Sequence, residues 1–351
     1  MGSRRVLVAL SGGVDSSVCA ALLLEQGFET AGAVLDLSPC HEPAVEAAKA
    51  SADALSIPLH VIREREQFDQ EVIAPFARSY YRGETPNPCI FCNPQVKFAL
   101  VCAKARELGF SHIATGHYAG LENREGKLWL KKAGFLPRDQ SYMLYRLTQE
   151  QLGMLLLPLA GLSKEQVREK ARALGLPCAG SPDSQEICFV PPGGSYAGFL
   201  ESRFGPSKPG WFVSPEGERI APHKGLLHYT AGQRKHLGVA LGRPAFIRRI
   251  DGESGDILLG YAGEEYAGSV LLRDVVFLPD RDTVLQGETI FAAQVKVRSR
   301  AVPSPARVTC LADGRALVEF EQPERAPAPG QSCVFYRDEW VLGGGVIVES
   351  R

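Results

Sequence analysis

SGGVDSS, residues 11–17, stands between an apolar run at 6–10 and a helical pattern over 16–26 that ends at Gly27. Glycines after a buried strand allow a sharp turn, and the free amides at the helix start make an anion site. Ser16 and Ser17 add hydroxyl donors, and we expect Asp15 to act through a bound Mg²⁺ rather than against bare phosphate. The string is neither a Walker A motif nor the dinucleotide fingerprint. It therefore predicts a nucleotide-binding loop rather than a simple Gly-rich helix cap.

Strand and helix patterns alternate through the first half of the chain. Further strands are expected at 30–37, 59–62 and 112–115, and helices at 44–55 and 95–108. This alternation indicates an α/β domain whose parallel sheet is covered by helices on both faces. Two more helices are announced by capping boxes, Thr148 with Gln151 and Ser163 with Gln166.

The pattern changes at the Pro-Pro-Gly-Gly sequence of residues 191–194. Short β-type runs separated by Gly and Pro follow it, and they indicate a small barrel or sandwich. These runs are 270–277, 291–298, 307–311, 316–320 and 333–336. We expect domain boundaries that give residues 1–195, 196–264 and 265–351.

Composition indicates an ordinary globular protein of 351 residues, with 45% apolar and 23% charged residues. No apolar run reaches the roughly 18 residues of a membrane span, and the N-terminus lacks a signal-peptide pattern, so we expect a cytoplasmic protein without a membrane partner. Nine cysteines in such a chain favour thiol chemistry or metal binding over a disulfide scaffold. The net charge of −1 hides two basic stretches without acids, 219–250 and 291–312, which indicate either solvated surface or a polyanion site.

We expect the two segments that carry paired or isolated reactive cysteines to lie in loops. TPNPCIFCN spans 85–93 with Cys89 and Cys92, and DSQEICF spans 183–189 with Cys188. Separated thiols suit sulfur transfer, because one can carry a persulfide and another can resolve it as a disulfide. The other cysteines are interpreted as structural: Cys19, Cys102, Cys310 and Cys333 as core, the Cys40-His41 pair as structural rather than metal-binding, and Cys178 as undecided.

The chain resembles the tRNA-specific 2-thiouridylases, a branch of the PP-loop ATP pyrophosphatases, along nearly its whole length. The resemblance rests on SGGVDSS (11–17), TPNPCIFCN (85–93) with VKF (96–98), ATGHY (114–118), DQSY (139–142) with LYRL (144–147), DSQEICFV (183–190), GQRK (232–235), PGQ (329–331) and LGGG (342–345). It implies a PP-loop catalytic domain with an adenine nucleotide α-hydrolase-like fold, a small central tRNA-binding domain and a C-terminal β-barrel.

The resemblance also implies a mechanism. ATP would adenylate O2 of the wobble uridine, U34, and a persulfide on Cys188 would supply sulfur to C2. Cys92, the family's nucleophile, would end as a disulfide with Cys188. A cysteine desulfurase or sulfur-relay protein would load the persulfide, and the tRNA acceptors would be those for Lys, Glu and Gln.

Further residues fall at positions with family roles. The ATP positions are Ala9, Leu10, Ser11, Gly12, Gly13, Val14, Asp15, Ser16, Leu35 and Gly116. Those at the target base are Asn87, Pro88 and Cys89. The tRNA positions are His117, Arg138, Asp139, Gln140, Arg298, Ser299 and Gln331. We also expect Arg234, in the first basic stretch, to bind tRNA phosphates.

Cys89 departs from the family pattern, in which many relatives have Asp. With Cys92 and Cys188 it makes three thiols, which could hold a [4Fe-4S] cluster with one open iron. We rank the persulfide route first, keep the cluster as a hypothesis, and leave open that Cys89 is a loop residue without a role.

Two other classes of protein remain as alternatives. A PP-loop synthetase of a small molecule would explain the glycine loop but not the paired thiols or the basic stretches. An RNA-binding protein with structural ATP would not need an intact loop together with both cysteine segments. Release of pyrophosphate that depends on tRNA separates the three.

Overall fold

The structure is a computed structural model that describes residues 4–182, 187–239 and 241–351. Residues 183–186 of the second cysteine segment therefore lie outside the described residues. The chain forms two compact units, which are described separately. Unit 1 holds residues up to Val72, Cys89–Phe189 and Glu339–Val341, and unit 2 holds Ile73–Pro88, Val190–Asp338 and Leu342–Arg351.

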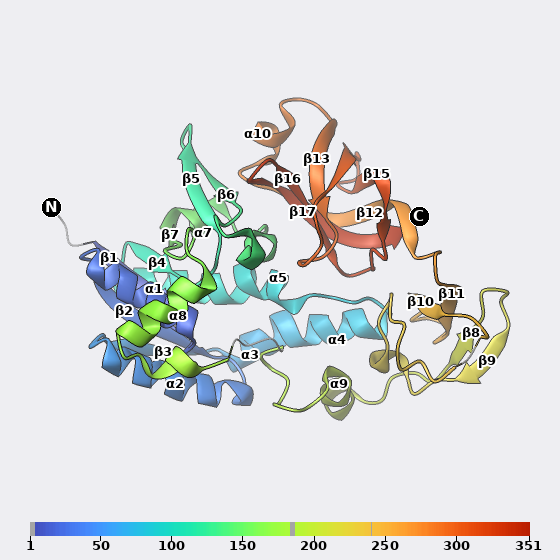
Figure 1. Cartoon of the computed structure of the whole chain (residues 1–351), viewed down its shortest axis with the longest axis horizontal. Coiled ribbons are helices and arrows are strands. Elements are labelled where there is room, and N and C mark those ends of the chain that lie inside the picture. Colours follow the sequence, from blue (N-terminus) through green and yellow to red (C-terminus); the bar gives the residue numbers. More distant parts are fainter. Residues whose placement is uncertain (1–3, 183–186, 240) are drawn as a thin grey trace. The chain divides into compact units, whose positions relative to one another are not determined.

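Unit 1 is built on five parallel strands in the order β3-β2-β1-β4-β7 (Figure 1). They are β1 (Arg5–Ala9), β2 (Glu29–Asp36), β3 (Leu59–Arg63), β4 (His112–Ala114) and β7 (Leu155–Leu156). Val6 and Val8 pack in one core cluster with α1 (Val14–Glu25) and α2 (Glu42–Ala54). The buried Leu7 between them points to the other face, since strand side chains alternate, and α6 (Phe98–Glu107) contacts β1 and β4. The predicted α/β parallel-sheet domain is confirmed.

The remaining elements of unit 1 surround this sheet. Both expected capping boxes are present, with reciprocal hydrogen bonds between Thr148 and Gln151 and between Ser163 and Gln166. The remaining helices and strands of unit 1 are α3 (Arg65–Phe68), α5 (Pro88–Cys92), the hairpin β5 (Gly120–Arg124) and β6 (Lys127–Lys131), α7 (Gln149–Met154) and α8 (Lys164–Ala173).

The expectation that Cys89 and Cys92 lie on a loop is wrong. Both lie on α5, which continues through a π turn, Asn93–Lys97, into α6. Proline signals suggested the loop, but Pro88 is the first residue of the helix, where a fixed φ and a missing N–H are tolerated.

Unit 2 contains a small sheet and a closed barrel. The sheet has the order β10-β11-β8-β9, with β8 (Trp211–Val213), β9 (Arg219–Pro222), β10 (Ala245–Ile250) and β11 (Ile257–Tyr261). The helices of this unit are α4 (Ala74–Tyr81), α9 (Tyr196–Phe204) and α10 (Arg281–Leu285). None of the described helices is long and apolar enough to cross a membrane. The division into three domains stays a prediction.

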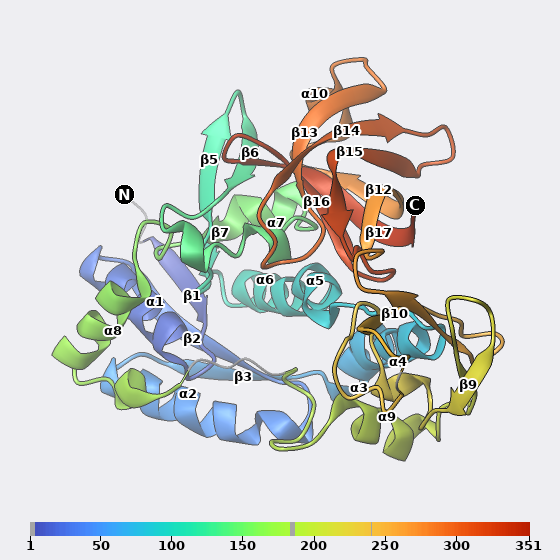
Figure 2. The same cartoon turned by 45° about the vertical axis from the view of Figure 1, so that its right-hand side comes forward.

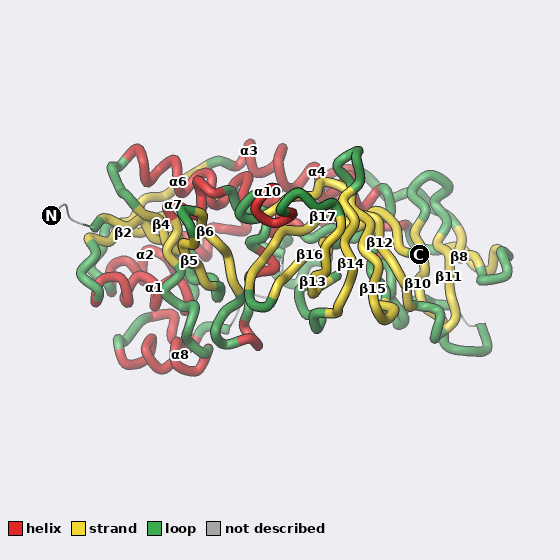
Figure 3. Tube along the Cα trace, turned by 90° about the horizontal axis from the view of Figure 1, so that it is seen from above, coloured by secondary structure: helices red, strands yellow, loops and turns green. Residues whose placement is uncertain are grey.

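The barrel strands follow the order β12-β15-β14-β13-β16-β17, and pairing of β12 with β17 closes the ring (Figures 2 and 3). They are β12 (Tyr266–Phe277), β13 (Ile290–Lys296), β14 (Ser304–Cys310), β15 (Ala316–Arg325), β16 (Ser332–Arg337) and β17 (Trp340–Ser350). A barrel is thereby confirmed over a sandwich.

Strand β17 has no counterpart among the predicted strands because Gly343-Gly344-Gly345 weakens a β-type pattern. These glycines permit the closure. A Cβ at Gly343 would lie 2.1 Å from the Val276 carbonyl oxygen, and one at Gly345 would lie 3.0 Å from the Arg273 carbonyl oxygen. The backbones of β12 and β17 thus approach more closely than side chains on β17 would allow.

Replacing Gly343 by Ala should destabilise unit 2 by about 3 kcal/mol, because the new methyl group meets backbone and the φ of +146° disfavours a side chain. Denaturant unfolding measures the change. Gly268→Ala on β12 is the matched control, since its Cβ would meet nothing closer than 3.9 Å. Equal stability of the two variants would contradict this account of the closure.

Candidate active site

The glycine loop lies at the carboxyl ends of the central strands, where ligands bind in open α/β sheets. Strand β1 leads into it, and the chain reverses its order of strands between β1 and β4. Gly12 has a φ of +75°, and a Cβ there would lie 2.5 Å from the Cβ of Ala47 on α2. The loop is therefore held tightly against α2 and leads directly into the start of α1.

The serine hydroxyls of the loop brace it from within. Ser16 Oγ and Ser17 Oγ each donate to the Gly13 carbonyl oxygen at 3.0 Å. Ser16 Oγ also accepts from the Ser11 amide at 3.1 Å. Ser11 is exposed, so its hydroxyl rather than that of the buried Ser17 is presented to solvent.

Asp15, on the first turn of α1, is neutralised by a lysine that the sequence analysis missed. Lys164 Nζ lies 2.7 Å from Asp15 Oδ1, and the Tyr118 hydroxyl donates to the same oxygen at 2.8 Å. The sequence around Lys164 shows only the capping box at the start of α8, and no local signal pairs residues 149 positions apart.

These residues do not fit a magnesium ion held by the protein. Mg²⁺ requires a near-octahedral shell of oxygens, whereas Asp15 Oδ1 already binds an ammonium group and a hydroxyl. Across residues 4–182, 187–239 and 241–351, no three His, Cys, Asp or Glu side chains are grouped to hold a metal ion. A magnesium ion acting at Asp15 stays a prediction.

Gly116 and His117 follow β4 and connect the loop to the cysteines. A Cβ at Gly116 would lie 2.7 Å from the Asp15 carbonyl carbon, so the two segments meet backbone to backbone. His117 stacks on Phe98, and its Nδ1 lies 2.8 Å from Thr115 Oγ1. Burial, assisted by the nearby charge of Lys97, lowers the pKa of His117 to about 3, so the imidazole is neutral.

Two of the expected tRNA positions have their polar groups engaged within unit 1. Asp139 Oδ1 accepts from the amides of Ala133 and Ser141. Gln140 Oε1 accepts from the Tyr118 amide at 3.0 Å. Arg138 beside them is half-buried, and the half-buried Leu35 lies near the carboxyl end of β2. Asp139 and Gln140 therefore shape this segment, and their contact with tRNA stays a prediction.

The three thiols at Cys89, Cys92 and Cys188 interact electrostatically. Burial raises the pKa of Cys92 to about 11, and Cys89 adds to this effect. The pKa of Cys188 rises to about 12, first because protein surrounds its sulfur and then because of Cys89 and Cys92. Cys188 is exposed as a whole residue, although its sulfur is surrounded by protein. In the resting chain Cys92 and Cys188 are protonated at neutral pH, which protects them from chance oxidation.

Lys97 is the cation of this thiol cluster. Its charge lowers the pKa of both Cys92 and Cys188, and its backbone N–H interacts with the Cys92 thiol. An α-helical spacing would turn residue 97 away from residue 92, but the π turn, with its i→i+5 bonds, brings the two together. In the sequence Lys97 stands out only as part of the VKF motif, which does not indicate this contact.

Phe91 anchors the first cysteine segment, because the Arg146 guanidinium lies 5.0 Å from the centre of its ring. A fourth thiol lies at the second segment. Cys40 Sγ donates to the carbonyl oxygen of Phe189, next to Cys188, at 3.5 Å. Cys40 therefore braces the Cys188 turn, in agreement with a structural interpretation.

The other cysteines mostly follow expectation. Cys19, Cys102 and Cys333 are buried, and Cys178, left undecided, is buried as well. The expectation that Cys310 is a core residue is wrong. It is only partly buried, because it ends β14 at the rim of the barrel.

In unit 2 the segment before the cysteines is held by the barrel. The Thr85 amide donates to the Pro329 carbonyl at 2.7 Å, and Gln331 Nε2 donates to the Thr85 carbonyl at 2.5 Å. Asn87 and Pro88 follow and are half-buried. The expected tRNA position Gln331 is thus engaged in supporting this segment.

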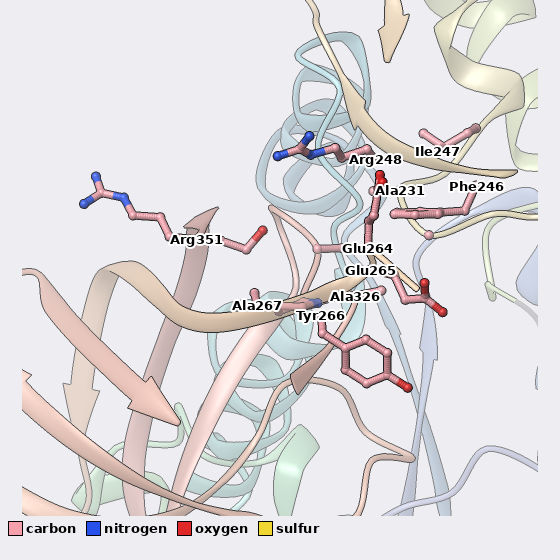
Figure 4. A pocket seen from close by; sticks show the side chains of 14 residues that line it. Ala231, Phe246, Ile247, Arg248, Glu264, Glu265, Tyr266, Ala267, Ala326 and Arg351 are labelled. Atoms are coloured by element: carbon pink, nitrogen blue, oxygen red, sulfur yellow. The ribbon is translucent and has the colours of Figure 1, made fainter. Parts of the chain in front are cut away.

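The expected tRNA position Arg298 is exposed and Ser299 half-buried, in the turn after β13. Arg234, in contrast, forms an ion pair with the buried Glu265, which also binds Arg325. Glu265 lines a cavity of about 110 Å³ together with Phe246, Tyr266 and Ala326 (Figure 4). Arg234 is thus engaged in an ion pair while its side chain stays 42% exposed, and its contact with tRNA phosphates stays a prediction, as for the exposed Lys235 beside it.

A parallel sheet with a glycine loop at the switch point places residues 4–192 in the HUP class of domains. Family models match three successive parts of the chain: the tRNA methyl transferase HUP domain at residues 4–192, the tRNA methyl transferase PRC-barrel domain at 197–261, and the aminomethyltransferase beta-barrel domain at 268–347.

Similar proteins give the particular family. The chain is 42% identical over 363 aligned residues to the tRNA-specific 2-thiouridylase MnmA of Acetivibrio thermocellus, with 99% of this chain and 100% of that protein covered. It is 43% identical to the protein of the same name from Carboxydothermus hydrogenoformans, with 99% and 98% covered. The chain belongs to the tRNA-specific 2-thiouridylase family, as the sequence motifs predicted.

Replacing Lys97 by Met should slow alkylation of Cys92 by iodoacetamide at a fixed pH of about 8 by several-fold, because loss of the cation raises the thiol pKa above about 11. Mass spectrometry of the Cys92 peptide across pH measures the rate, which should rise about tenfold per pH unit below that pKa. Lys104→Met on α6, whose lysine pairs with Glu107, is the control. An unchanged rate profile in the Lys97 variant would exclude Lys97 as the activating cation.

Proposed function

We propose that this chain makes 2-thiouridine at the wobble position, U34, of tRNA. It uses ATP to activate O2 of the uridine and a cysteine persulfide to supply sulfur. The relatives carry the name tRNA-specific 2-thiouridylase. The observation that carries the proposal is that the nucleotide loop and the thiols share neighbours. Gly116 packs on Asp15 of the loop. The charge of Lys97 lowers the pKa of the next residue, His117, and also the pKa of Cys92 and Cys188.

The first step is adenylation. O2 of U34 attacks the α-phosphorus of ATP, the α–β bond breaks, and pyrophosphate leaves. The amides at the start of α1 suit the departing anion, because they offer N–H donors and the positive end of a helix dipole. AMP on O2 turns a carbonyl oxygen into a leaving group. The ATP positions from Ala9 to Ser16, with Leu35 and Gly116, retain their proposed roles.

The second step is sulfur transfer. A cysteine desulfurase or relay protein loads Cys188 as a persulfide. Cys92 attacks Sγ of Cys188, the terminal sulfur leaves with the bonding electrons and adds to C2, and AMP departs. A Cys92–Cys188 disulfide remains, and an external thiol must reduce it before the next cycle. Lys97 favours the Cys92 thiolate that this attack requires.

The substrate side of the proposal rests on the resemblance and on charge. Asn87, Pro88 and Cys89 would hold the target base, while His117, Arg138, Asp139, Gln140, Arg298, Ser299 and Gln331 would lie along the tRNA. Exposed cations of the first basic stretch, among them Lys224, Lys235 and Arg248, would bind phosphates, so affinity should fall with salt. The acceptors would be the tRNAs for Lys, Glu and Gln.

Incubation with ATP, a persulfide source and tRNA should give 2-thiouridine by nucleoside mass spectrometry, together with pyrophosphate. Cys92→Ser and Cys188→Ser should each lower the yield at least about a hundredfold, because the nucleophile or the sulfur carrier is lost. Cys310→Ala, at the barrel rim, is the control. Pyrophosphate release without tRNA would favour a small-molecule synthetase, and no release at all would favour a binding module.

Anaerobically purified protein should be colourless, free of iron and fully active with the persulfide source, because no three-cysteine group among the described residues is arranged to hold a metal. Iron analysis and activity are measured on the same sample, and Cys89→Ala should be as free of iron as the wild type. Iron bound in proportion to activity and lost in Cys89→Ala would instead establish the [4Fe-4S] route.

A further inference from the structure

Two lysines of α8 bind two carboxylates of α1. Lys164 Nζ lies 2.7 Å from Asp15 Oδ1, and Lys170 Nζ lies 2.7 Å from Glu25 Oε2. The pairs have equal lengths and join the same helices, but their surroundings differ. The Lys164 side chain is 5% exposed, whereas that of Lys170 is 31% exposed.

The Lys164 pair is costly to build, since burying an ammonium group is unfavourable unless it is paired and hydrogen-bonded. The Lys170 pair, in solvent, contributes little. A buried lysine at the nucleotide loop therefore calls for a role beyond joining two helices, which Lys170 already does. The position of Lys164 suggests a role in the charge of the loop, because its partner Asp15 carries the only charge within residues 11–17.

A carboxylate at a phosphate loop opposes the ligand. Asp15 keeps 32% of its side chain exposed on the first turn of α1, where the anion must approach the amides. An ATP molecule brings several negative charges to this point, and one uncompensated carboxylate at about 6 Å would weaken binding roughly tenfold per charge at an intermediate dielectric constant. The hydroxyl of Tyr118 orients the carboxylate but cannot cancel its charge.

We propose that Lys164 is a positioning residue for ATP, which neutralises and fixes Asp15 so that the loop accepts the β- and γ-phosphates. Lys164 thus supplies, from within the protein, the positive charge that the sequence had assigned to a magnesium ion at Asp15. This inference rests on the proposed use of ATP and adds a residue to it.

The test measures nucleotide binding by calorimetry, with magnesium present and without tRNA. Lys164→Met should weaken ATP binding roughly tenfold or more, weaken AMP binding less, and leave adenosine binding unchanged, because the repulsion grows with ligand charge. Lys170→Met is the matched control and should bind all three ligands as the wild type does. Equal ATP affinity in Lys164→Met and wild type would overturn the inference.

A second variant separates charge from structure. Asp15→Asn combined with Lys164→Met leaves no unpaired charge, so ATP affinity should return to within about threefold of the wild type. A loss that persists in the double variant, or one that is equal for ATP and adenosine, would show that Lys164 acts through packing or that Asp15 is needed as an anion. The double variant also remains informative if the single variant fails to fold.

Failure of the Lys164 inference can be told apart from failure of the proposed function. A wild type that binds ATP but makes no 2-thiouridine would refute the thiolation and leave the comparison of ATP with AMP intact. A wild type that thiolates tRNA while Lys164→Met retains full ATP affinity would refute only the role of Lys164.

Discussion

The Asp15 carboxylate is the point at which three segments of unit 1 meet. It lies on the first turn of α1, accepts a hydrogen bond from the Tyr118 hydroxyl in the segment after β4, and pairs with Lys164 at the start of α8. The backbone of Gly116 packs directly against the same residue. Because these segments come from distant parts of the sequence, the geometry of the nucleotide loop depends on tertiary contacts as well as on its own glycines.

The segment after β4, which holds Gly116 and Tyr118, also contacts the helix that follows the first cysteines. His117 stacks on Phe98, the first residue of α6, and Lys97 precedes it at the end of the π turn. A π turn is less stable than an α turn and is often found at functional sites. Here it turns an ammonium group toward the thiols, so a local irregularity of the helix serves the electrostatics of the cluster.

Much of the fold was predictable because its signals are local. The glycine loop, the capping boxes and most strands of the sheet and barrel follow from patterns within a few residues. The helix that carries Cys89 and Cys92 was missed, because proline begins helices as well as loops. Strand β17 was missed because its glycines are explained only by the backbone they meet.

The candidate site was predictable in its motifs and less so in its charges. Motifs named the loop, Gly116 and the three thiols, but Lys164 and the position of Lys97 come from contacts that no spacing in the sequence reveals. Arg234 shows the converse. A basic stretch marked it as a phosphate ligand, but its partner Glu265 lies outside that stretch.

The attachment of Thr85 to the barrel has a consequence for how this chain can be divided. The Pro329 carbonyl and the Gln331 side chain bind the main chain of Thr85 through two hydrogen bonds, three residues ahead of the helix that bears the first cysteines. A shortened protein that stops before residue 329 would lack both anchors, so the approach to that helix would fray even though Cys89, Cys92 and Cys188 are retained. The barrel therefore helps to fix the course of residues 85–88, and a fragment without it would lose that support.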